Sequence, residues 1–129
     1  MFAVDTNVIV RYLTADDPGQ SKRARAIMDE SDVWISTTVL LESEWVLRSV
    51  YDFPRTEVAS ALRRLSGLPH VVLEAPATAA TALLWAEQGL DFADALHLAA
   101  ADGREAFLTF DGRLARAAGT IGSIPVREP

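Results

Sequence analysis

Apolar residues in this chain fall into short runs, separated by longer stretches in which apolar positions recur every three or four residues. A short apolar run bounded by turn residues is typical of a buried strand, and the longer spacing is typical of an amphipathic helix. Strands that alternate with helices predict an α/β fold around a mainly parallel sheet. The predicted strands are Phe2–Val4, Val33–Ile35, Val71–Leu73, Phe107–Phe110 and Ile124–Val126.

Capping residues set the expected helix boundaries. Asp17, Pro18 and Gln20 predict a helix start with a capping box. Pro125 confines the last predicted strand to a sheet edge or a strand end, because proline has no N–H group to donate. The expected helices are Val8–Leu13, Pro18–Glu30, Val39–Tyr51, Pro54–Gly67 and Pro76–Glu87, followed by two helices that are capped by Asp91 and Asp111 and reach Asp102 and Ala118.

Length and composition exclude several classes of protein. The 129 residues amount to one domain with one core. No apolar run approaches the ~20 residues that a membrane span needs, and no basic signal region precedes the first strand, so we expect a cytoplasmic protein. The chain has no cysteine, which excludes disulfides, zinc–thiolate sites and thiol nucleophiles. The net charge of −6 argues against a general nucleic-acid binder, but not against a nuclease.

Four carboxylates, those of Asp5, Glu42, Asp94 and Asp111, lie where an apolar run meets a turn or along a predicted helix. Ligands of open parallel sheets bind at the carboxyl ends of the strands, so Asp5 and Asp111 would face one crevice if their strands were neighbours. Carboxylates about 5 Å apart repel by roughly 3 kcal/mol per pair at an effective dielectric constant of about 20. A shared pocket would therefore need a cation, and oxygen ligands favour magnesium or manganese over zinc.

Several of these acids also have a purely structural interpretation. Asp5, Asp91 and Asp111 are placed to cap helices, and Asp94 is placed to complete a capping box with Asp91. A protein in which all the acids are caps would be a catalytically silent binding module. Metal titration separates this hypothesis from an enzyme, because scattered caps would not create one saturable site.

Two glutamates on the helix expected at Val39–Tyr51 have different surroundings. Glu42 falls at the edge of the apolar arc and has no cation four residues on, so we expect it to be partly buried and functional. Glu44 lies on the other side of the helix, and we expect it to form a surface ion pair with Arg48.

The order and setting of these residues resemble the PIN-domain family of metal-dependent ribonucleases, and within it the compact VapC-type toxins of bacterial toxin–antitoxin pairs. Each segment alone is short, but the four follow one another in the same order within a single chain. The matching segments are Val4–Asn7, Val39–Leu47, Asp91–Ala95 and Leu108–Asp111.

The resemblance implies a single PIN-like domain over residues 1–129, with a central mainly parallel sheet in an α/β/α sandwich. It also implies a Mg²⁺- or Mn²⁺-dependent endoribonuclease that hydrolyses RNA phosphodiester bonds and inhibits translation or growth. The implied residues are the catalytic acids Asp5, Glu42, Asp94 and Asp111, of which Asp5 and Asp94 are the direct metal ligands, and the supporting residues Thr6, Asn7, Asp91 and Thr109.

The expected partners follow from the same resemblance and from the basic residues. A cognate antitoxin is implied, and we also expect a homodimer that binds RNA and no membrane. A phosphatase with Asp5 as nucleophile is the other enzyme we considered, but Asn7 stands where such enzymes need a second aspartate. The candidates for binding substrate phosphates are Arg11, Lys22, Arg23 and Arg25.

Overall fold

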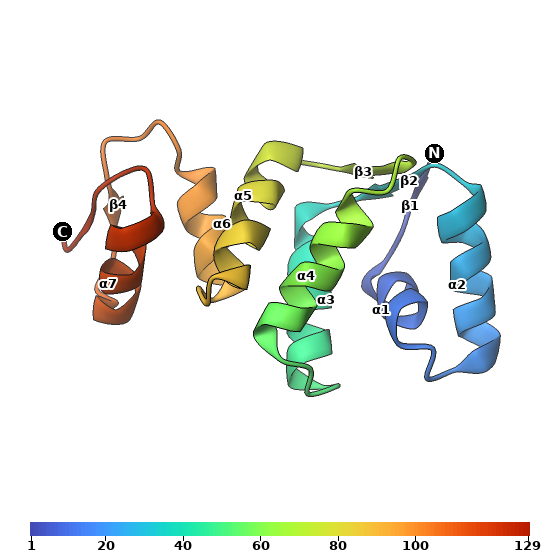
Figure 1. Ribbon diagram of the computed structural model, residues 1–129. Helices are drawn as coiled ribbons and strands as arrows, with labels where there is room; N and C mark the ends of the chain where they lie inside the picture. The colour runs from blue at the N-terminus through green and yellow to red at the C-terminus, as the bar shows by residue number, and fades with distance from the viewer.

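Helices and parallel strands make up the chain, as Figure 1 shows. The computed structural model describes the backbone of residues 1–129 and every side chain except that of residue 120. The predicted α/β class and mainly parallel strand pairing are confirmed. The elements are β1 (Phe2–Ala3), α1 (Thr6–Thr14), α2 (Pro18–Glu30), β2 (Val33–Ile35), α3 (Thr37–Ser49), α4 (Arg55–Ser66), β3 (Val71–Leu73), α5 (Pro76–Glu87), α6 (Phe92–Ala100), β4 (Phe107–Leu108), α7 (Gly112–Ile121) and β5 (Val126–Arg127).

Local capping explains most of the helix starts. The carboxylate of Asp17 accepts a hydrogen bond from the N–H of Gln20, as predicted for α2, with Pro18 at the first helical position. Only half of the predicted capping box forms there, because the Gln20 side chain instead accepts a bond from Arg11. The first helix begins at Thr6 rather than at Val8, because Asp5 caps the Thr6 N–H group.

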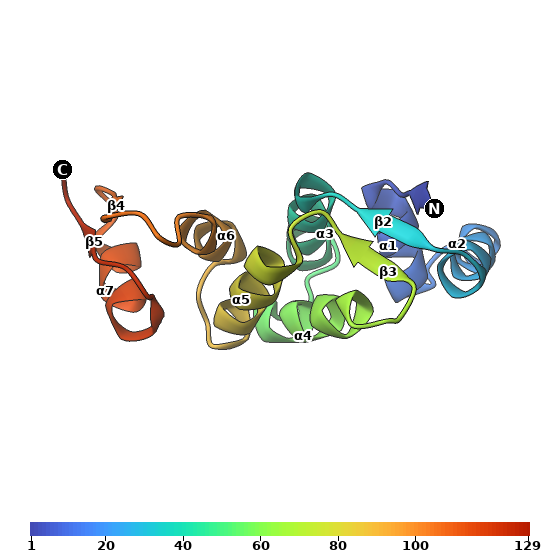
Figure 2. The same cartoon turned by 90° about the horizontal axis from the view of Figure 1, so that it is seen from above.

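The strands form two separate parallel sheets rather than one continuous central sheet. One sheet has the order β1–β2–β3, and β4 pairs only with β5 in the other. Figures 1 and 2 show β1 and β4 at opposite ends of the molecule, with α3, α4, α5 and α6 between them. The strands before Asp5 and Asp111 are therefore not neighbours, and the single crevice that neighbouring strands would create does not form within this chain.

Helix α7 and the β4–β5 sheet lie beyond α6, on the side away from β1 (Figures 1 and 2). Leu114 and Ala118 on α7 are buried. At Gly122, which follows α7, an added Cβ would lie only 3.1 Å from a methyl carbon of Leu98 on α6, so the two segments are in close contact. The chain just after α7 therefore lies against α6.

The helices form a row that extends from α2, past the β1–β2–β3 sheet, to α7 (Figures 1 and 2). Helix α5 contacts both α4 and α6, and α1 contacts both α2 and α3. The largest fully buried apolar side chains come from most of these elements and form one cluster. Among the described residues, no helix is both long and apolar enough to cross a lipid bilayer.

Helix α3 buries a different face from the one expected. Its buried residues are Leu40, Ser43, Glu44 and Leu47, which follow the i, i+3, i+4, i+7 spacing of one helical stripe. Glu44 is only 3 % exposed, whereas Glu42 is exposed. The expectations of a surface Glu44 and a partly buried Glu42 were therefore wrong, because part of the apolar arc used to orient the helix lies at the surface.

Arg48 compensates the buried Glu44 carboxylate. The Nε of Arg48 donates to Glu44 Oε2 at 3.1 Å, and this hydrogen bond raises the pKa of the guanidinium. A buried carboxylate that loses such a partner would be costly, so the pair is part of the packing between α3 and its neighbours.

We predict that Glu44→Gln lowers the free energy of unfolding by ~1–3 kcal/mol, because it removes a charge-assisted hydrogen bond at a buried position. Chemical denaturation measures the loss. Glu30→Gln, at an exposed site on α2, is the matched control and should change stability by less than about 0.5 kcal/mol. Equal effects of the two substitutions would show that Glu44 is not stabilising the packing of α3.

Candidate active site

Thr6 joins two of the candidate acids. Asp5 follows β1, and its carboxylate accepts a hydrogen bond from the Thr6 N–H at 2.7 Å. The Thr6 side chain is buried, and its hydroxyl donates to Glu42 Oε1 on α3 at 2.5 Å. Asp5 and Glu42 are themselves exposed, and Thr6 joins their two segments.

A cavity of about 700 Å³ lies beside Asp5, between β1, α1 and α2. Its polar lining includes Asp5 and Asn7 and two of the candidate phosphate-binding residues, Arg11 and Arg23. The other two, Lys22 and Arg25, are exposed on α2 and are not among the lining residues. The cavity thus brings an acid and two arginines to one place.

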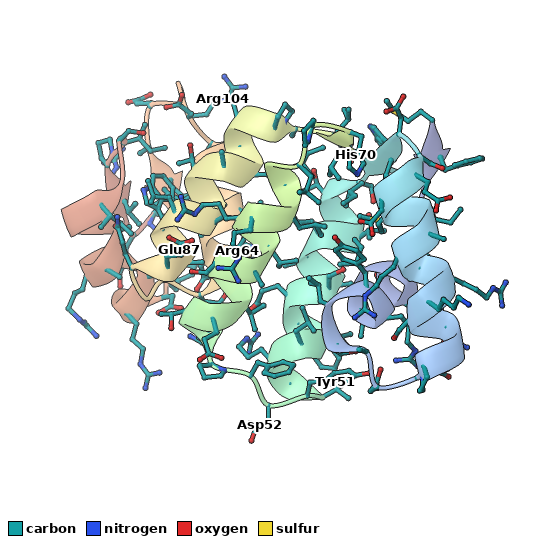
Figure 3. The ribbon with its side chains drawn as sticks, turned by 45° about the vertical axis from the view of Figure 1, so that its right-hand side comes forward. Tyr51, Asp52, Arg64, His70, Glu87 and Arg104 are labelled. Atoms are coloured by element: carbon teal, nitrogen blue, oxygen red, sulfur yellow. The ribbon has the colours of Figure 1, made fainter. Side chains whose placement is uncertain are left out.

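Arg11 is fixed in this cavity by three partners. Its guanidinium donates to Gln20 at 2.8 Å and to the Tyr51 hydroxyl at 2.8 Å, and it pairs with Asp16 at 3.2 Å. Tyr51 follows the end of α3, as Figure 3 shows, and its hydroxyl donates to Asp16 at 2.6 Å, which lowers the pKa of that carboxyl. No ion pair holds Arg23 among the described residues, so its charge is available to a ligand.

A second group of acids lies where α6 and α7 begin. Asp91 caps α6 by accepting from the Asp94 N–H at 3.1 Å, but Asp94 returns no bond to Asp91 among those described, so this capping box is incomplete. Asp111 caps α7 through the N–H groups of Arg113 and Leu114, and its own N–H donates to the Thr109 hydroxyl.

The surroundings of Asp94 change the pKa of its carboxyl. Burial raises its pKa, and repulsion from Asp91 and Asp111 raises it further, while His97 and Arg55 act in the opposite direction. The carboxylates of Asp91, Asp94 and Asp111 therefore share one electrostatic environment. A raised carboxyl pKa with like charges nearby is typical of a site that accepts a cation.

Two arginines near these acids were not found from the sequence. Arg55 pairs with Asp91 at 3.6 Å, and the charge of Asp91 contributes to the raised pKa of Arg48. Both arginines come from segments remote from Asp91 in the chain. The one local signal was the i, i+4 spacing of Glu44 and Arg48. It indicated that Arg48 pairs with Glu44, and it did not indicate that Arg48 lies near Asp91.

A cavity of about 500 Å³ separates the two groups of acids. It lies between α3 and the start of α6, and its lining includes Glu42, Leu41, Trp45 and, next to Asp94, Ala93. Among the described residues, no three or more aspartate, glutamate or histidine side chains lie close enough together to hold a metal ion. Asp5 and Glu42 therefore form one group of acids on one side of this cavity, and Asp94 and Asp111 belong to the other group.

The chemistry of the donors fits a hard divalent cation. All four candidate acids supply carboxylate oxygens, which Mg²⁺ and Mn²⁺ prefer. Neither histidine is paired with another: His70 hydrogen-bonds to the carbonyl of Met28, and His97 is exposed on α6. The donor types therefore favour magnesium or manganese, even though the described residues of one chain do not gather them in one coordination shell.

The raised pKa of Asp94 predicts how stability depends on pH. Ionisation of Asp94 costs folding free energy, so the penalty is absent below the ordinary carboxyl pKa of about 4 and complete above the raised value. Without added metal, Asp94→Asn should raise the melting temperature at pH 7, and this gain should vanish at acidic pH. Thermal melts across pH measure it, with Asp32→Asn at an exposed loop position as control. A gain that persists at low pH would contradict this account.

Comparison with known proteins identifies the family. No curated protein shows significant similarity to the chain. A family model described as the PIN domain matches residues 2–120, which is most of the chain. PIN domains are generally metal-dependent nucleases. The chain therefore belongs to the PIN domain family, and this membership indicates a function of the nuclease type.

Proposed function

We propose that this protein is a Mg²⁺- or Mn²⁺-dependent endoribonuclease of the VapC type, the toxin of a toxin–antitoxin pair that acts in the cytoplasm. The observation that carries the proposal is the hydrogen bond from Thr6 to Glu42, because it joins the acid-bearing end of β1 to the acid on α3. Membership of the PIN domain family supports the nuclease part of the proposal. The four acidic segments of the sequence support the toxin part.

The acids have separate tasks in this proposal. Asp5 and Asp94 would hold the cation, and Asp111 would complete the acidic site from the end of β4. Thr6 orients Glu42 by donating to one carboxylate oxygen, which leaves the other oxygen free for a ligand or a proton. When bound, the cation lowers the pKa of a water molecule and stabilises charge on the phosphate oxygens.

Arg11 and Arg23 would position the RNA backbone. Both line the cavity that contains Asp5, and guanidinium groups bind phosphates through paired hydrogen bonds. Arg11 is already oriented by Gln20, Asp16 and Tyr51, so little side-chain freedom would be lost when it binds phosphate. The net charge of −6 restricts favourable phosphate contacts to such local sites.

The cavity between α3 and α6 would receive the antitoxin. Trp45 and Leu41 give it apolar walls, and Trp45 is exposed at its surface. Glu42 lies in the same lining, so an arginine of the antitoxin could pair with a carboxylate needed by the cation. A disordered antitoxin tail that folds on binding would fit this combination of an apolar wall and an acidic end.

A catalytically silent binding module is the second candidate, because Asp5, Asp91 and Asp111 do cap helices. A capping carboxylate keeps acceptor capacity, since each carboxylate has about four lone-pair sites. Asp94 also has no capping bond among those described, although it is half-buried and repelled by its neighbours. This costly placement favours the nuclease over the module.

We predict that Asp5→Asn and Asp94→Asn each reduce cleavage of RNA in Mn²⁺ by at least about 100-fold, because even a residue that only supports a metal ligand contributes 10- to 100-fold. Cleavage of a fluorescent RNA pool measures the rates, and a chelator should abolish the wild-type reaction. Asp32→Asn is the control with unchanged activity.

A melting-temperature assay separates loss of metal binding from misfolding. Mn²⁺ should raise the melting temperature of the wild type by mass action, and Asp5→Asn should lose most of this rise. Cleavage that survives in Asp5→Asn and remains chelator-sensitive would place the metal elsewhere. A wild type that neither cleaves RNA nor binds Mn²⁺ at a saturable site would leave the silent module as the function.

We predict that expression of this chain alone arrests bacterial growth, because an uninhibited ribonuclease destroys RNA in the cell. Co-expression with the neighbouring antitoxin gene should restore growth and give an inactive complex. Asp5→Asn, expressed to the same level, should be harmless without the antitoxin. Growth curves after induction measure this effect. If the wild type is as harmless as Asp5→Asn, the toxin role is wrong, whatever the metal assay shows.

A further inference from the structure

The three acids at the starts of α6 and α7 differ in whether a cation pairs with them. Nitrogen Nη2 of Arg55 lies 3.6 Å from Oδ2 of Asp91. Among the described residues, no ion pair reaches Asp94 or Asp111. Asp91 and Asp94 are therefore unlike in charge environment, although they lie only three residues apart at the start of the same helix.

Both carboxylate oxygens of Asp91 face a partner within the protein. Oδ1 accepts the hydrogen bond from the Asp94 N–H that caps α6, and Oδ2 faces Arg55. A carboxylate keeps further lone pairs, but a guanidinium beside one oxygen repels a second cation from that place. The Asp94 side chain makes no hydrogen bond among those described, so its oxygens are free of such competition.

Arg55 reaches Asp91 from a remote part of the chain. It is the first residue of α4, and α4 and α6 begin at the same end of the row of helices, the lower end in Figure 1. A cation at a helix start opposes the helix dipole, and an exposed ion pair contributes little stability. Because the side chain of Arg55 is 50 % exposed, the main effect of the pair is on the charge of Asp91 rather than on folding.

Arg48 cannot take the place of Arg55. Its Nε donates to the buried Glu44 carboxylate at 3.1 Å, and this bond raises the pKa of the guanidinium more than the charge of Asp91 does. Moving Arg48 to Asp91 would leave Glu44 buried without its cation, which is costly. Arg55 is therefore the cation that can leave Asp91 without disturbing the packing of α3.

Arg55 also changes the charge that this group of acids offers to a metal ion. Three ionised carboxylates carry three negative charges, and one paired guanidinium leaves two, which matches a single divalent cation. The affinity of a protein site for a hard cation depends on the charge of its ligands. Whether Asp91 is paired therefore decides how strongly the group attracts metal.

We propose that Arg55 is a positioning residue of the acidic site, which holds Asp91 away from the metal and leaves Asp94 as the acid of α6 that binds the cation. Asp91 keeps its structural task as the cap of α6. The ion pair between α4 and α6 then sets the metal affinity. The inference rests on the proposed nuclease function, because it concerns the metal of that site.

Titration with manganese chloride tests this role without an activity assay. Arg55→Gln frees the Asp91 carboxylate and should tighten Mn²⁺ binding by at least about 5-fold, because ligand charge sets the affinity. Asp91→Asn keeps a capping side chain and should abolish that gain. Adding Arg55→Gln to Asp91→Asn should change the dissociation constant by less than about 2-fold, the usual error of additivity. Calorimetry on the full chain measures the four constants.

Two further variants separate the ion pair from the overall charge of the protein. Arg55→Lys keeps a cation beside Asp91 and should restore the wild-type affinity for Mn²⁺. Arg64→Gln removes an exposed arginine from the same helix (Figure 3), one without an ion pair among the described residues, and should leave the affinity unchanged. Equal gains in Arg64→Gln and Arg55→Gln, or a gain that persists with Asp91→Asn, would be effects of net charge and overturn the inference.

Cleavage assays distinguish failure of this inference from failure of the proposed function. The Mn²⁺ concentration for half-maximal cleavage should fall in Arg55→Gln by the same factor as the dissociation constant. A wild type that binds Mn²⁺ and cleaves RNA, while Arg55→Gln binds no more tightly, overturns the role of Arg55 alone. A wild type that does neither overturns the nuclease. Mn²⁺ binding that then appears in Arg55→Gln and requires Asp91 still supports the role of Arg55, and its absence overturns both.

Discussion

The structure depends on one local constraint, which is that the first N–H groups of a helix need an acceptor outside the helix. Asp5, Asp91 and Asp111 each satisfy this need at the start of α1, α6 or α7. Asp5 and Asp111 come within three residues of the ends of β1 and β4. Capping thereby fixes carboxylates at the carboxyl ends of strands, so the same residues that begin helices are also placed where a parallel sheet binds ligands.

Much of the fold could be predicted because its signals are local. The capping residues Asp17 and Asp111 fix helix starts through contacts within three residues, and Pro125 restricts the last strand through its own missing N–H group. The order of elements followed from these signals. The separation of the strands into two sheets did not, because it depends on contacts between residues far apart in the chain, such as that of Gly122 with Leu98.

The candidate site was less predictable for a related reason. Helical periodicity placed Glu42 and Glu44 on opposite faces, but it assigned burial to the wrong one, because apolar residues such as Val50, just after α3, are exposed. The hydroxyl of Thr6 reaches Glu42 only through the packing of α1 on α3. Likewise, the cations near Asp91 come from distant segments. A sequence identifies which acids are present, whereas tertiary packing decides which cations and hydroxyls surround them.

The hydrogen bonds of Tyr51 have a consequence for how the site tolerates change. One phenol, placed after the last turn of α3, contacts both the guanidinium of Arg11 on α1 and the carboxylate of Asp16 in the turn before α2. Three segments therefore share a single anchor, and Arg11 can keep its orientation only while the end of α3 stays in place. A substitution that moves the turn after α3 would therefore disturb Arg11 in the cavity that contains Asp5, although Tyr51 does not itself line that cavity.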